Sequence, residues 1–417
     1  MLHSPNQTTY NGKEEPRASI ARVVIFIAAF IAVIAYFAER SFRYYFGYEN
    51  HVKIENKLPF IAAGGFSSFF IDKNGKVYAA GANKFGELGL GDDVNRSSFI
   101  SVSSLSDKNV IAIASTYGCS LALDADGKVY AAGKNKNCRF DLGDNADRKT
   151  FAPVSSLEGK KIVAIAAGDY HSLALSDEGK VYATGVNEYG QLGLNDYDDR
   201  EVFTLVSSLS DKRVVAIAAG RYHSLALDNR GKVYATGGNK KSQLGLGGYN
   251  NRKIFTFISS LGGKNIAAIS AGTEHSLALD SGGKVYAAGE NSLAQLGFDD
   301  TKNRNTFTLV SSLSDKKIIT IVASGYSSLA LDSVGKVYAA GGNFYGQLGL
   351  GYYDSFDLVY DLSYDKIISV AMGGYHSLAI GADGKLYATG HNGGGQLGLG
   401  DNEHCPSFTP VSSFIEQ

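Results

Sequence analysis

One sequence unit is repeated seven times along almost the whole chain, and this repeat limits the possible folds more than any other feature. Its marker is Gly-Lys-Val/Leu-Tyr-Ala, and the copies follow one another at steps of 52 residues, except for a last step of 49. The first glycines of the seven markers are Gly75, Gly127, Gly179, Gly231, Gly283, Gly335 and Gly384. A fixed period of this length indicates a solenoid, a propeller or an array of repeats. Such folds offer binding faces rather than one deep catalytic pocket.

Each unit contains four segments that read as short strands. In the third unit, residues 162–167 are small and β-branched, residues 171–175 alternate, and residues 180–185 follow a Gly-containing hairpin loop. Residues 203–209 form the fourth strand, and no segment shows the 3.6-residue period of a helix. Four antiparallel strands in each of seven units predict an all-β fold, a seven-bladed β-propeller of four-stranded antiparallel blades over residues 58–417.

The end of the chain allows two ways of closing such a ring. The strand expected at residues 407–414 either completes the seventh blade or staples to the first. Composition agrees with a sheet-rich globular body, since 44% of the residues are apolar and 19% are charged. The net charge is −1, and the body contains no basic run. A nucleic-acid binder normally shows a basic stripe, so we expect no nucleic-acid partner.

The N-terminal segment, residues 1–57, lies outside the repeats. Residues 1–19 are polar and mixed in charge and are predicted to be disordered. Residues 20–38 contain one 16-residue stretch without a charge, and 19 residues of helix reach roughly 28 Å, close to the thickness of a bilayer core. Aromatic and basic residues follow, as is typical of a membrane interface. We therefore predict one hydrophobic helix, a transmembrane helix or signal anchor, followed by a linker at residues 39–57.

Two other readings of the hydrophobic segment stay open. A cleaved secretory signal would use Val33-x-Ala35 as its cleavage site, and the third reading is a buried core helix. The expected localisation is a single-pass membrane protein, with secretion as the alternative. Basic residues flank both sides of the segment, and the expected orientation places the N-terminus in the cytoplasm.

The repeat also resembles a known family. The recurring pattern is A-x-G-x-x-H-S-L-A-L, then G-K-V-Y-A-x-G-x-N-x-x-G-Q-L-G-L-G, then F-x-x-V-S-S-L. It resembles the regulator-of-chromosome-condensation repeat family over residues 58–417, with an N-terminal anchor and of a bacterial type. The resemblance implies a seven-bladed propeller. Family members serve as exchange factors for Ran-type GTPases, as tubulin- or chromatin-associated modules, as an inhibitor of β-lactamases, as secreted effectors and as an ultraviolet photoreceptor. This chain has no Trp, which excludes the tryptophan-based photoreceptor mechanism.

Three rows of polar residues recur at fixed repeat positions, and each is interpreted as scaffold. Histidines occupy one position in four units, with Ser or Cys in the others, and we expect partly buried imidazoles bonded to a neighbouring loop backbone. An Asn that recurs in every unit is expected to hold a turn, and an Arg in five units to pair with a loop or a neighbouring blade. In the last two units, Phe356 and Cys405 are read as replacing this Arg. The rows are His171, His223, His275, His376; Asn83, Asn135, Asn187, Asn239, Asn291, Asn343, Asn392; and Arg96, Arg148, Arg200, Arg252, Arg304.

The sequence shows no pattern that carries side-chain catalysis. The Gly-rich stretches lack the Lys-Ser/Thr of a phosphate loop, the Asp-rich loops lack the spacing of a calcium loop, and the three cysteines (Cys119, Cys138, Cys405) form no CxxC pair. We therefore predict no catalytic, cofactor-binding or metal-binding residues, no cofactor, and no enzymatic activity.

Departures from the repeat are the best pointers to a partner. The sixth unit is three residues short, and its segment at residues 351–365 is rich in Tyr and Asp. Tyr is favoured in interface hot spots, although a repacked outer strand is the competing reading. The second unit departs at residues 137–141, and the fifth has Leu293-Ala294. The predicted contact residues are Tyr352, Tyr353, Phe356, Tyr360, Tyr364, Arg139 and Phe140.

These observations predict a membrane-tethered, monomeric protein-interaction propeller with a protein partner, attached to the membrane through residues 20–38. The alternative is a guanine-nucleotide exchange factor for a Ran-like small GTPase, including the case of a secreted bacterial effector. The family's Ran exchange factor uses a wedge inserted into one blade. No unit here exceeds 52 residues, which weakens that alternative.

Overall fold

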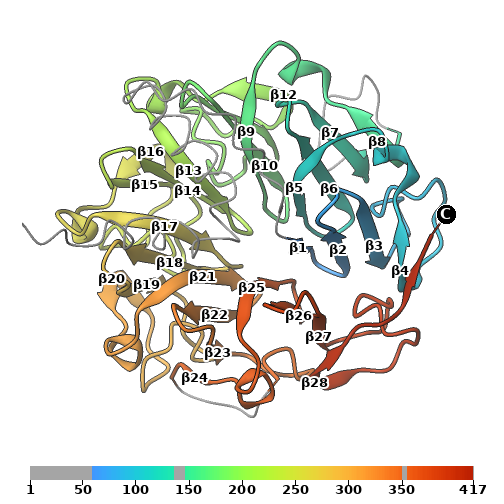
Figure 1. Cartoon of the computed structure of the whole chain (residues 1–417). Helices are drawn as coiled ribbons and strands as arrows, with labels where there is room; N and C mark the ends of the chain where they lie inside the picture. Colours follow the sequence, from blue (N-terminus) through green and yellow to red (C-terminus); the bar gives the residue numbers. More distant parts are fainter. Residues whose placement is uncertain (1–58, 136–145, 350–354, 417) are drawn as a thin grey trace, which may run out of the picture.

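Seven sheets, each built on four antiparallel strands, stand around one axis in the computed structural model, which describes residues 59–135, 146–349 and 355–416. Figure 1 shows the sheets following one another around a ring, with the first strand of each sheet at the centre and the fourth at the circumference. The predicted seven-bladed β-propeller is thus confirmed. The hydrophobic helix predicted before the propeller, over residues 20–38, lies outside the described residues and is not shown.

The strands keep the order in which the repeat predicted them. The first three blades consist of β1 (Phe60–Ala63), β2 (Ser67–Ile71), β3 (Val77–Gly81) and β4 (Arg96–Ser101); β5 (Val110–Ser115), β6 (Cys119–Asp124), β7 (Val129–Gly133) and β8 (Arg148–Pro153); and β9 (Ile162–Ala167), β10 (His171–Ser176), β11 (Val181–Gly185) and β12 (Arg200–Leu205). The fourth and fifth consist of β13 (Val214–Ala219), β14 (His223–Asp228), β15 (Val233–Gly237) and β16 (Arg252–Phe257); and β17 (Ile266–Ala271), β18 (His275–Asp280), β19 (Val285–Gly289) and β20 (Arg304–Leu309).

The last two blades consist of β21 (Ile318–Ser324), β22 (Ser327–Asp332), β23 (Val337–Gly341) and β24 (Asp357–Leu358); and β25 (Ile367–Met372), β26 (His376–Gly381), β27 (Leu386–Gly390) and β28 (Cys405–Pro410). One turn of 3-10 helix follows the fourth strand of the first six blades: η2 (Ser103–Leu105), η3 (Ser155–Leu157), η4 (Ser207–Leu209), η5 (Ser259–Leu261), η6 (Ser311–Leu313) and η7 (Tyr360–Leu362). The described chain ends in β29 (Phe414–Ile415).

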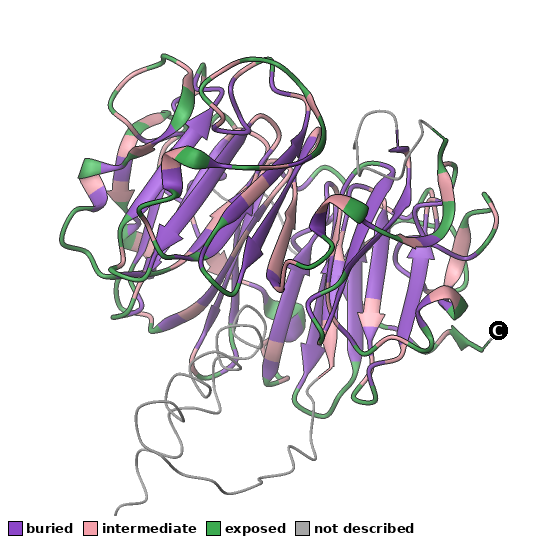
Figure 2. Cartoon of the chain, turned by 90° about the horizontal axis from the view of Figure 1, so that it is seen from above, coloured by how far each residue is buried: buried purple, intermediate pink, exposed green. Residues whose placement is uncertain are grey.

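Burial explains why these short segments are strands. The second and third strands of a blade are buried along nearly their whole length, as in β14 and β15, because both faces of each sheet pack against a neighbouring blade. The fourth strands are mostly exposed or half-buried: in β16 only Phe255 is buried, because this strand lies at the circumference of the ring (Figure 1). Figure 2 shows buried strands running between two layers of exposed loops. The apolar clusters accordingly lie between blades, each shared by two neighbours.

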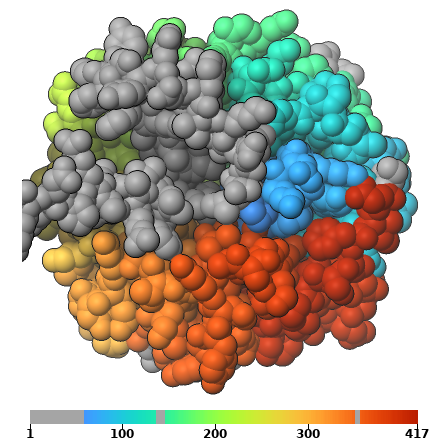
Figure 3. Space-filling view, viewed as in Figure 1, coloured from blue at the N-terminus to red at the C-terminus, as the bar shows by residue number. Residues whose placement is uncertain are grey.

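The ring closes in two ways at once, which answers the question left by the sequence. Strand β28 completes the seventh blade, and β29 then pairs in parallel with β4 of the first blade. An apolar cluster joins the two blades, with Leu378 and Ile380 packed against Ile61 and Phe99. In Figure 3 the C-terminal segment lies beside the first blade at the edge of the disc.

Strand β29 fits the first blade because that blade lacks a bulky residue. Leu205, Phe257 and Leu309 end the fourth strands of the third to fifth blades and pair with a Tyr of the third strand. The corresponding residue in the first blade is Ser101, which pairs with Tyr78. The ring of Phe414 lies 5.5 Å from Tyr78, 5.3 Å from Phe99 and 5.4 Å from Phe70, so it fills the space that Ser101 leaves.

A buried Phe and a tight glycine join neighbouring blades at six junctions within the described residues. Gly89 has φ +71°, and a Cβ there would lie 2.4 Å from the ring of Phe151 in the next blade. The same contact recurs between Gly297 and Phe356, where a Cβ would lie 2.1 Å from the ring. Phe356 therefore belongs to the Phe row of the repeat and does not replace an Arg. The three missing residues precede it in the sequence, and this shift misled the alignment of the sixth unit.

The four histidines link neighbouring blades. His171 Nε2 lies 2.7 Å from Ser224 Oγ of the next blade, and the same bond joins His223 to Ser276, His275 to Ser328 and His376 to Ser68. Each of these hydroxyls donates to a backbone carbonyl, so it can only accept from the imidazole, which must carry its proton on Nε2. The scaffold role is confirmed, but the partner is a Ser side chain and the rings are fully buried.

Each of these histidines also requires a glycine three residues earlier. A Cβ at Gly220 would lie 2.3 Å from Cε1 of His223 and 2.4 Å from the carbonyl oxygen of Gly272. Two blades have Thr116 and Ser324 at this position, and neither carries a histidine three residues later. The Gly-x-x-His pattern therefore recurs because the imidazole occupies the space that a Cβ at the first position would need.

The Asn and Arg rows are scaffold as well. Asn187 Oδ1 accepts from the backbone N–H of Leu192, and its Nδ2 donates to the carbonyl of Asp196, which closes the loop after the third strand. Arg200 forms an ion pair with the same Asp196, and Arg96 and Arg304 pair likewise with Asp92 and Asp300. Loop pairing is thus confirmed for these arginines.

The membrane prediction needs correction. In the three described stretches of the chain, no helix has the length and apolar character needed to cross a bilayer. On this finding the predicted single-pass membrane localisation is not retained. The segment predicted as a transmembrane helix or signal anchor, residues 20–38, lies outside the described residues, as do the polar N-terminus and the linker.

Replacing Phe414 by Ala is expected to destabilise the propeller, because it removes three ring contacts at the junction of the first and last blades. A partly buried Phe should cost about 2 kcal/mol, somewhat less than a fully buried one. Phe414 is itself 39% exposed, and Ile415→Ala is the matched control because Ile415, 49% exposed, makes none of these ring contacts. Urea unfolding of both variants checks this. Equal effects of the two changes would contradict the role of Phe414.

Acid is expected to destabilise the fold through the buried histidines. Burial lowers the pKa of His171, His223 and His376 from 6.5 to about 3, and that of His275 to about 4. The unfolded chain binds protons below its pKa, whereas the folded chain does not. Stability is therefore fully present above pH 6.5 and is lost as the pH falls toward 4, by about 1.4 kcal/mol per pH unit for each histidine.

The variant His223→Gln tests this linkage. It should reduce the slope of the unfolding free energy against pH between 6 and 4.5 by about one proton, whatever its effect at pH 7. Urea denaturation at several pH values measures the slope. An unaltered slope in His223→Gln would show that this histidine is not held neutral.

Candidate functional site: the mouth of the axial channel

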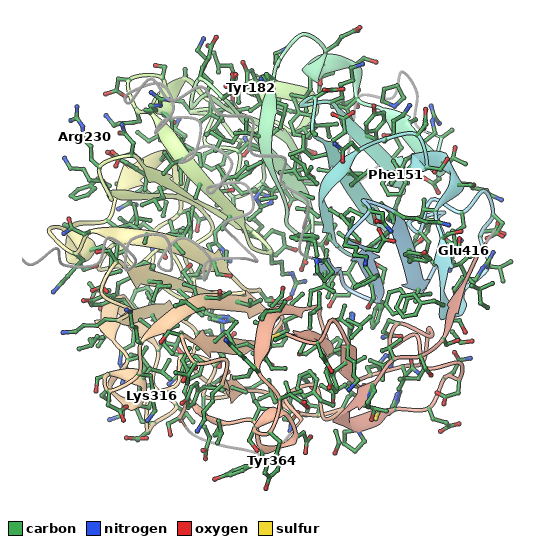
Figure 4. The ribbon with its side chains drawn as sticks, viewed as in Figure 1. Phe151, Tyr182, Arg230, Lys316, Tyr364 and Glu416 are labelled. Atoms are coloured by element: carbon green, nitrogen blue, oxygen red, sulfur yellow. The ribbon has the colours of Figure 1, made fainter. Side chains whose placement is uncertain are left out.

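The residues predicted as partner contacts do not form one site. Tyr360 and Tyr364 are 62% and 99% exposed, on the link between β24 and β25, and Figure 4 shows Tyr364 at the circumference of the ring. Phe356 is only 5% exposed and belongs to an inter-blade cluster, so its side chain does not reach the surface. Tyr352, Tyr353, Arg139 and Phe140 lie outside the described residues. The contact prediction stays a prediction for the two exposed tyrosines.

The axis of the propeller contains a cavity of about 310 Å³. Its walls are the first strands of the blades, with small or apolar residues such as Ala166, Ala218 and Ile217. Small residues are found here because seven strands crowd around one axis. At one end, the loops between the first and second strands surround a wider hollow of about 630 Å³. We call this end the channel mouth.

The channel mouth breaks the symmetry of the repeat. Each loop between a first and a second strand has a central position, two residues before the His, Ser or Cys that begins the second strand. Going around the ring from the first blade, this position holds Gly65, Tyr117, Asp169, Arg221, Thr273, Gly325 and Gly374. Polar side chains thus stand on the consecutive blades two to five, and glycines on blades six, seven and one. Sequence reasoning missed these residues, although the variation of this position between constant neighbours was a visible signal.

Arg221 and Asp169 are neighbouring charged groups of the channel mouth. Arg221 Nε lies 4.0 Å from Asp169 Oδ2, and the side chains are 35% and 24% exposed. The guanidinium lies over the ring of Tyr222 at 5.1 Å and near that of Tyr170 at 6.0 Å. These two rings are stacked with their centroids 5.1 Å apart. Aromatic faces therefore hold the guanidinium in place by cation–π attraction.

Burial changes the acid–base behaviour of the channel mouth. It raises the pKa of Asp169 from 3.8 to about 6, and the positive charge of Arg221 opposes this shift only in part. Burial also raises the pKa of Tyr117, with further contributions from Asp169, Tyr375 and Tyr326. The ring of Tyr117 reaches across two glycines, because a Cβ at Gly65 or Gly374 would lie within 2.5 Å of its atoms. Tyr117 therefore packs over the glycines of the first and seventh blades.

Acidic groups continue the channel mouth around the fourth and fifth blades. Lys241 donates to Glu290 at 2.8 Å, and Glu290 is 7% exposed. The pKa of Glu274 is raised by burial and by the neighbouring charge of Glu290. On the side of the first and second blades, Lys84 and Lys134 line the hollow of the channel mouth. The channel mouth thus combines charges of both signs.

Aromatic rings from the loops of the first, second, sixth and seventh blades gather beside the channel mouth. Tyr345 lies 5.5 Å from Tyr375 and 4.7 Å from His391, and Phe66 lies 5.3 Å from Tyr117. We call this set the aromatic crescent: Phe66, Tyr117, Tyr345, Tyr375, His391 and His404. Tyr117 and Tyr345 are 39% and 38% exposed, and the adjacent Phe344 is 56% exposed.

The channel mouth combines aromatic rings with a few charged side chains. Among residues 59–135, 146–349 and 355–416, no group of three or more His, Cys, Asp or Glu side chains is placed to hold a metal ion. The four fully buried histidines hold blades together and do not reach the channel mouth. What the loops present is aromatic surface, one arginine, and carboxylates whose charge depends on pH.

Comparison with known proteins assigns the family. The "RCC1-like domain" description matches residues 101–416, and the regulator of chromosome condensation (RCC1) repeat matches residues 74–123 and, in a second description, 60–87. The chain belongs to the RCC1-like family. This agrees with the resemblance read from the repeat, and the remarks on a bacterial type and an N-terminal anchor stay predictions.

Relatives of this RCC1-like chain include quite different proteins. It is 31% identical to the ultraviolet-B receptor UVR8 of Arabidopsis thaliana over 296 residues, which is 71% of this chain and 67% of the receptor. It is also 31% identical to the human E3 ubiquitin-protein ligase HERC2, but the match spans only 6% of that protein. The ligase activity of HERC2 is therefore no guide to this chain, which matches only one small part of it.

Solved structures confirm the fold alone. Yeast Prp20p, studied for its binding to Gsp1p and histones, gives a TM-score of 0.71 at 24% identity, over 81% of this chain and 86% of that one. Human WBSCR16 gives the same TM-score at 23% identity, over 81% of this chain and 94% of that one.

Titration of Asp169 is a direct check on the channel mouth. Its carboxyl carbon should titrate near pH 6 in NMR spectra, because burial disfavours the charged form. Arg221→Gln should raise that pKa further, since the guanidinium stabilises the carboxylate. Arg230→Gln, on an exposed hairpin, removes the same charge and should have no effect. A pKa of Asp169 near 4, or one unchanged in Arg221→Gln, would show that the carboxylate is well hydrated.

Proposed function

We propose that this chain is a protein-interaction propeller that binds its partner through the loops around the channel mouth, with the aromatic crescent as the main contact. The observation that carries the proposal is the gathering of exposed aromatic side chains on loops held by a rigid ring. Aromatic side chains dominate interface hot spots because they bury a large area and lose little conformational entropy. The polar groups of the channel mouth would supply orientation.

The rigidity of the ring supports this role. Each loop is fixed by buried backbone and Asn side-chain bonds, as at Asn343, whose Oδ1 accepts from the N–H of Leu348. Phe344 and Tyr345 follow directly after that anchor. A pre-organised surface loses little entropy on binding, so its exposed rings contribute more of their contact energy to affinity. The proposal includes no catalytic step.

An exchange reaction on a Ran-like GTPase is not part of the proposal. The likeness to Prp20p, at 24% identity, concerns the fold, and Gsp1p and histone binding are properties of that protein. No repeat here carries an insertion of wedge size. The coarser property that propellers of this family share, binding of a partner, is what the aromatic crescent supports.

Affinity capture with the full chain tests the proposal. The variant Phe344→Ala/Tyr345→Ala should lose the captured partner by at least about tenfold, since it removes two exposed aromatic contacts. The matched variant Tyr360→Ala/Tyr364→Ala, which changes two exposed rings at the circumference, should capture as much as the unaltered protein. Thermal unfolding should show that both variants stay folded.

The opposite result would place the partner contact at the circumference of the ring instead. If the Tyr360/Tyr364 variant loses the partner and the Phe344/Tyr345 variant keeps it, the outer segment predicted from the sequence is the contact. Equal capture by all three proteins would remove both surfaces from consideration.

A further inference from the structure

Two hydrogen-bond donors at the channel mouth have no partner within the described chain. Thr116 Oγ1 and Arg221 Nε are both buried, and neither forms a hydrogen bond there. Thr116 is 6% exposed, and both residues line the axial cavity as well as the hollow in front of it. An unsatisfied buried donor costs roughly 1–3 kcal/mol, so such groups call for an explanation.

We propose that the channel mouth is a binding site for the carboxylate group of a small organic acid, with Arg221 and Thr116 as its donors and the axial cavity as the place for the apolar part. This site goes beyond the proposed partner contact, because its donors are Arg221 and Thr116 and not the exposed rings of Phe344 and Tyr345.

Because Arg221 and Thr116 offer hydrogen-bond donors, the ligand must carry a hydrogen-bond acceptor. Arginine only donates, and its planar guanidinium matches the two oxygens of a carboxylate. Asp169 does not satisfy it, since 4.0 Å from Nε to Oδ2 is too long for a hydrogen bond. The rings of Tyr170 and Tyr222 fix the guanidinium, so its donors are already oriented before a ligand arrives.

The charges around the site favour a single negative charge. Asp169 faces Arg221 from the third blade, Glu274 adds an acidic group from the fifth, and Glu87 lines the hollow from the first. Lys84 and Lys134 line the same hollow, and Lys241 neutralises Glu290. A doubly charged phosphate would meet these carboxylates with more repulsion than one carboxylate does. Protonation of Asp169 in mild acid removes the nearest competing charge, which should strengthen binding.

The size and lining of the axial cavity determine which body the carboxylate ligand can carry. Its volume of about 310 Å³ is enclosed by residues such as Ala166, Ala218 and Ile217, which offer no charge. An apolar body therefore fits below the channel mouth, while the charged end stays at Arg221. Monocarboxylic acids of the size of benzoate meet both conditions.

Calorimetry with the full chain tests this site, with benzoate as the probe and neutral benzamide as its matched analogue. Benzoate should bind, more tightly at pH 5.5 than at pH 7.5, and benzamide at least about tenfold more weakly, because it carries no charge for Arg221. Arg221→Gln should weaken benzoate by at least about tenfold, and Thr116→Val by several-fold, as expected for a lost charged and a lost neutral hydrogen bond. Arg230→Gln, the same change on an exposed hairpin, should bind as the unaltered protein does.

A peptide arm separates two sources of the carboxylate. The peptide Ala-Ala-Phe with a free C-terminus and its C-terminal amide present the same side chains. Binding of the free peptide alone, tighter than benzoate, would assign the site to a polypeptide C-terminus. Tighter binding of benzoate would assign it to a free acid.

Two results would overturn the proposal: equal binding of benzoate and benzamide, or unaltered benzoate binding by a folded Arg221→Gln variant. Absence of benzoate and peptide binding at millimolar concentration would do so as well. Arg221→Lys guards against misfolding, since it keeps the charge and should bind benzoate with intermediate strength. None of these results depends on Phe344 or Tyr345, so the site and the proposed partner contact fail separately.

Discussion

Every blade depends on the packing of its two faces against its neighbours. A sheet of four short strands has two apolar faces here, as in β14 and β15, where nearly every residue is buried. One such sheet alone would expose both faces to water, and a pair would still expose two. Only a closed ring covers all of them, which is why the apolar clusters lie between blades. The Phe on glycine, the His on Ser and the final strand β29 all act at these same junctions.

Much of this architecture could be predicted from the sequence because every unit carries the same hydrophobic pattern and the same turn residues. The position of each strand followed from hydrophobic pattern and period, and the Asn and Arg rows were assigned to scaffold correctly. The His partners could not be identified, since a Ser 53 residues away in the next blade becomes a neighbour only after the ring forms. Phe356 was misplaced because three missing residues shift the register of the sixth unit.

The candidate site was harder to predict for a related reason. The partner contact was predicted at the largest departures from the repeat, residues 137–141 and 351–365. The channel mouth arises from single-residue variation at one loop position, from Gly65 through Arg221 to Gly374. No two of these residues are near each other in the chain, and each alone looks like ordinary loop variation. Only the ring brings Tyr117, Asp169 and Arg221 together, and only burial gives Asp169 its raised pKa.

A symmetric scaffold cannot select one ligand unless its symmetry is broken at the axis. Seven identical loops would present seven equal groups and favour no orientation. In this chain Gly374 of the seventh blade and Gly65 of the first leave room that the ring of Tyr117 occupies from the second blade. Arg221 then faces a hollow with a defined apolar side and a defined acidic side. Because the inter-blade junctions hold the loops in place, these few substitutions give the channel mouth an orientation without any cost to the packing that closes the ring.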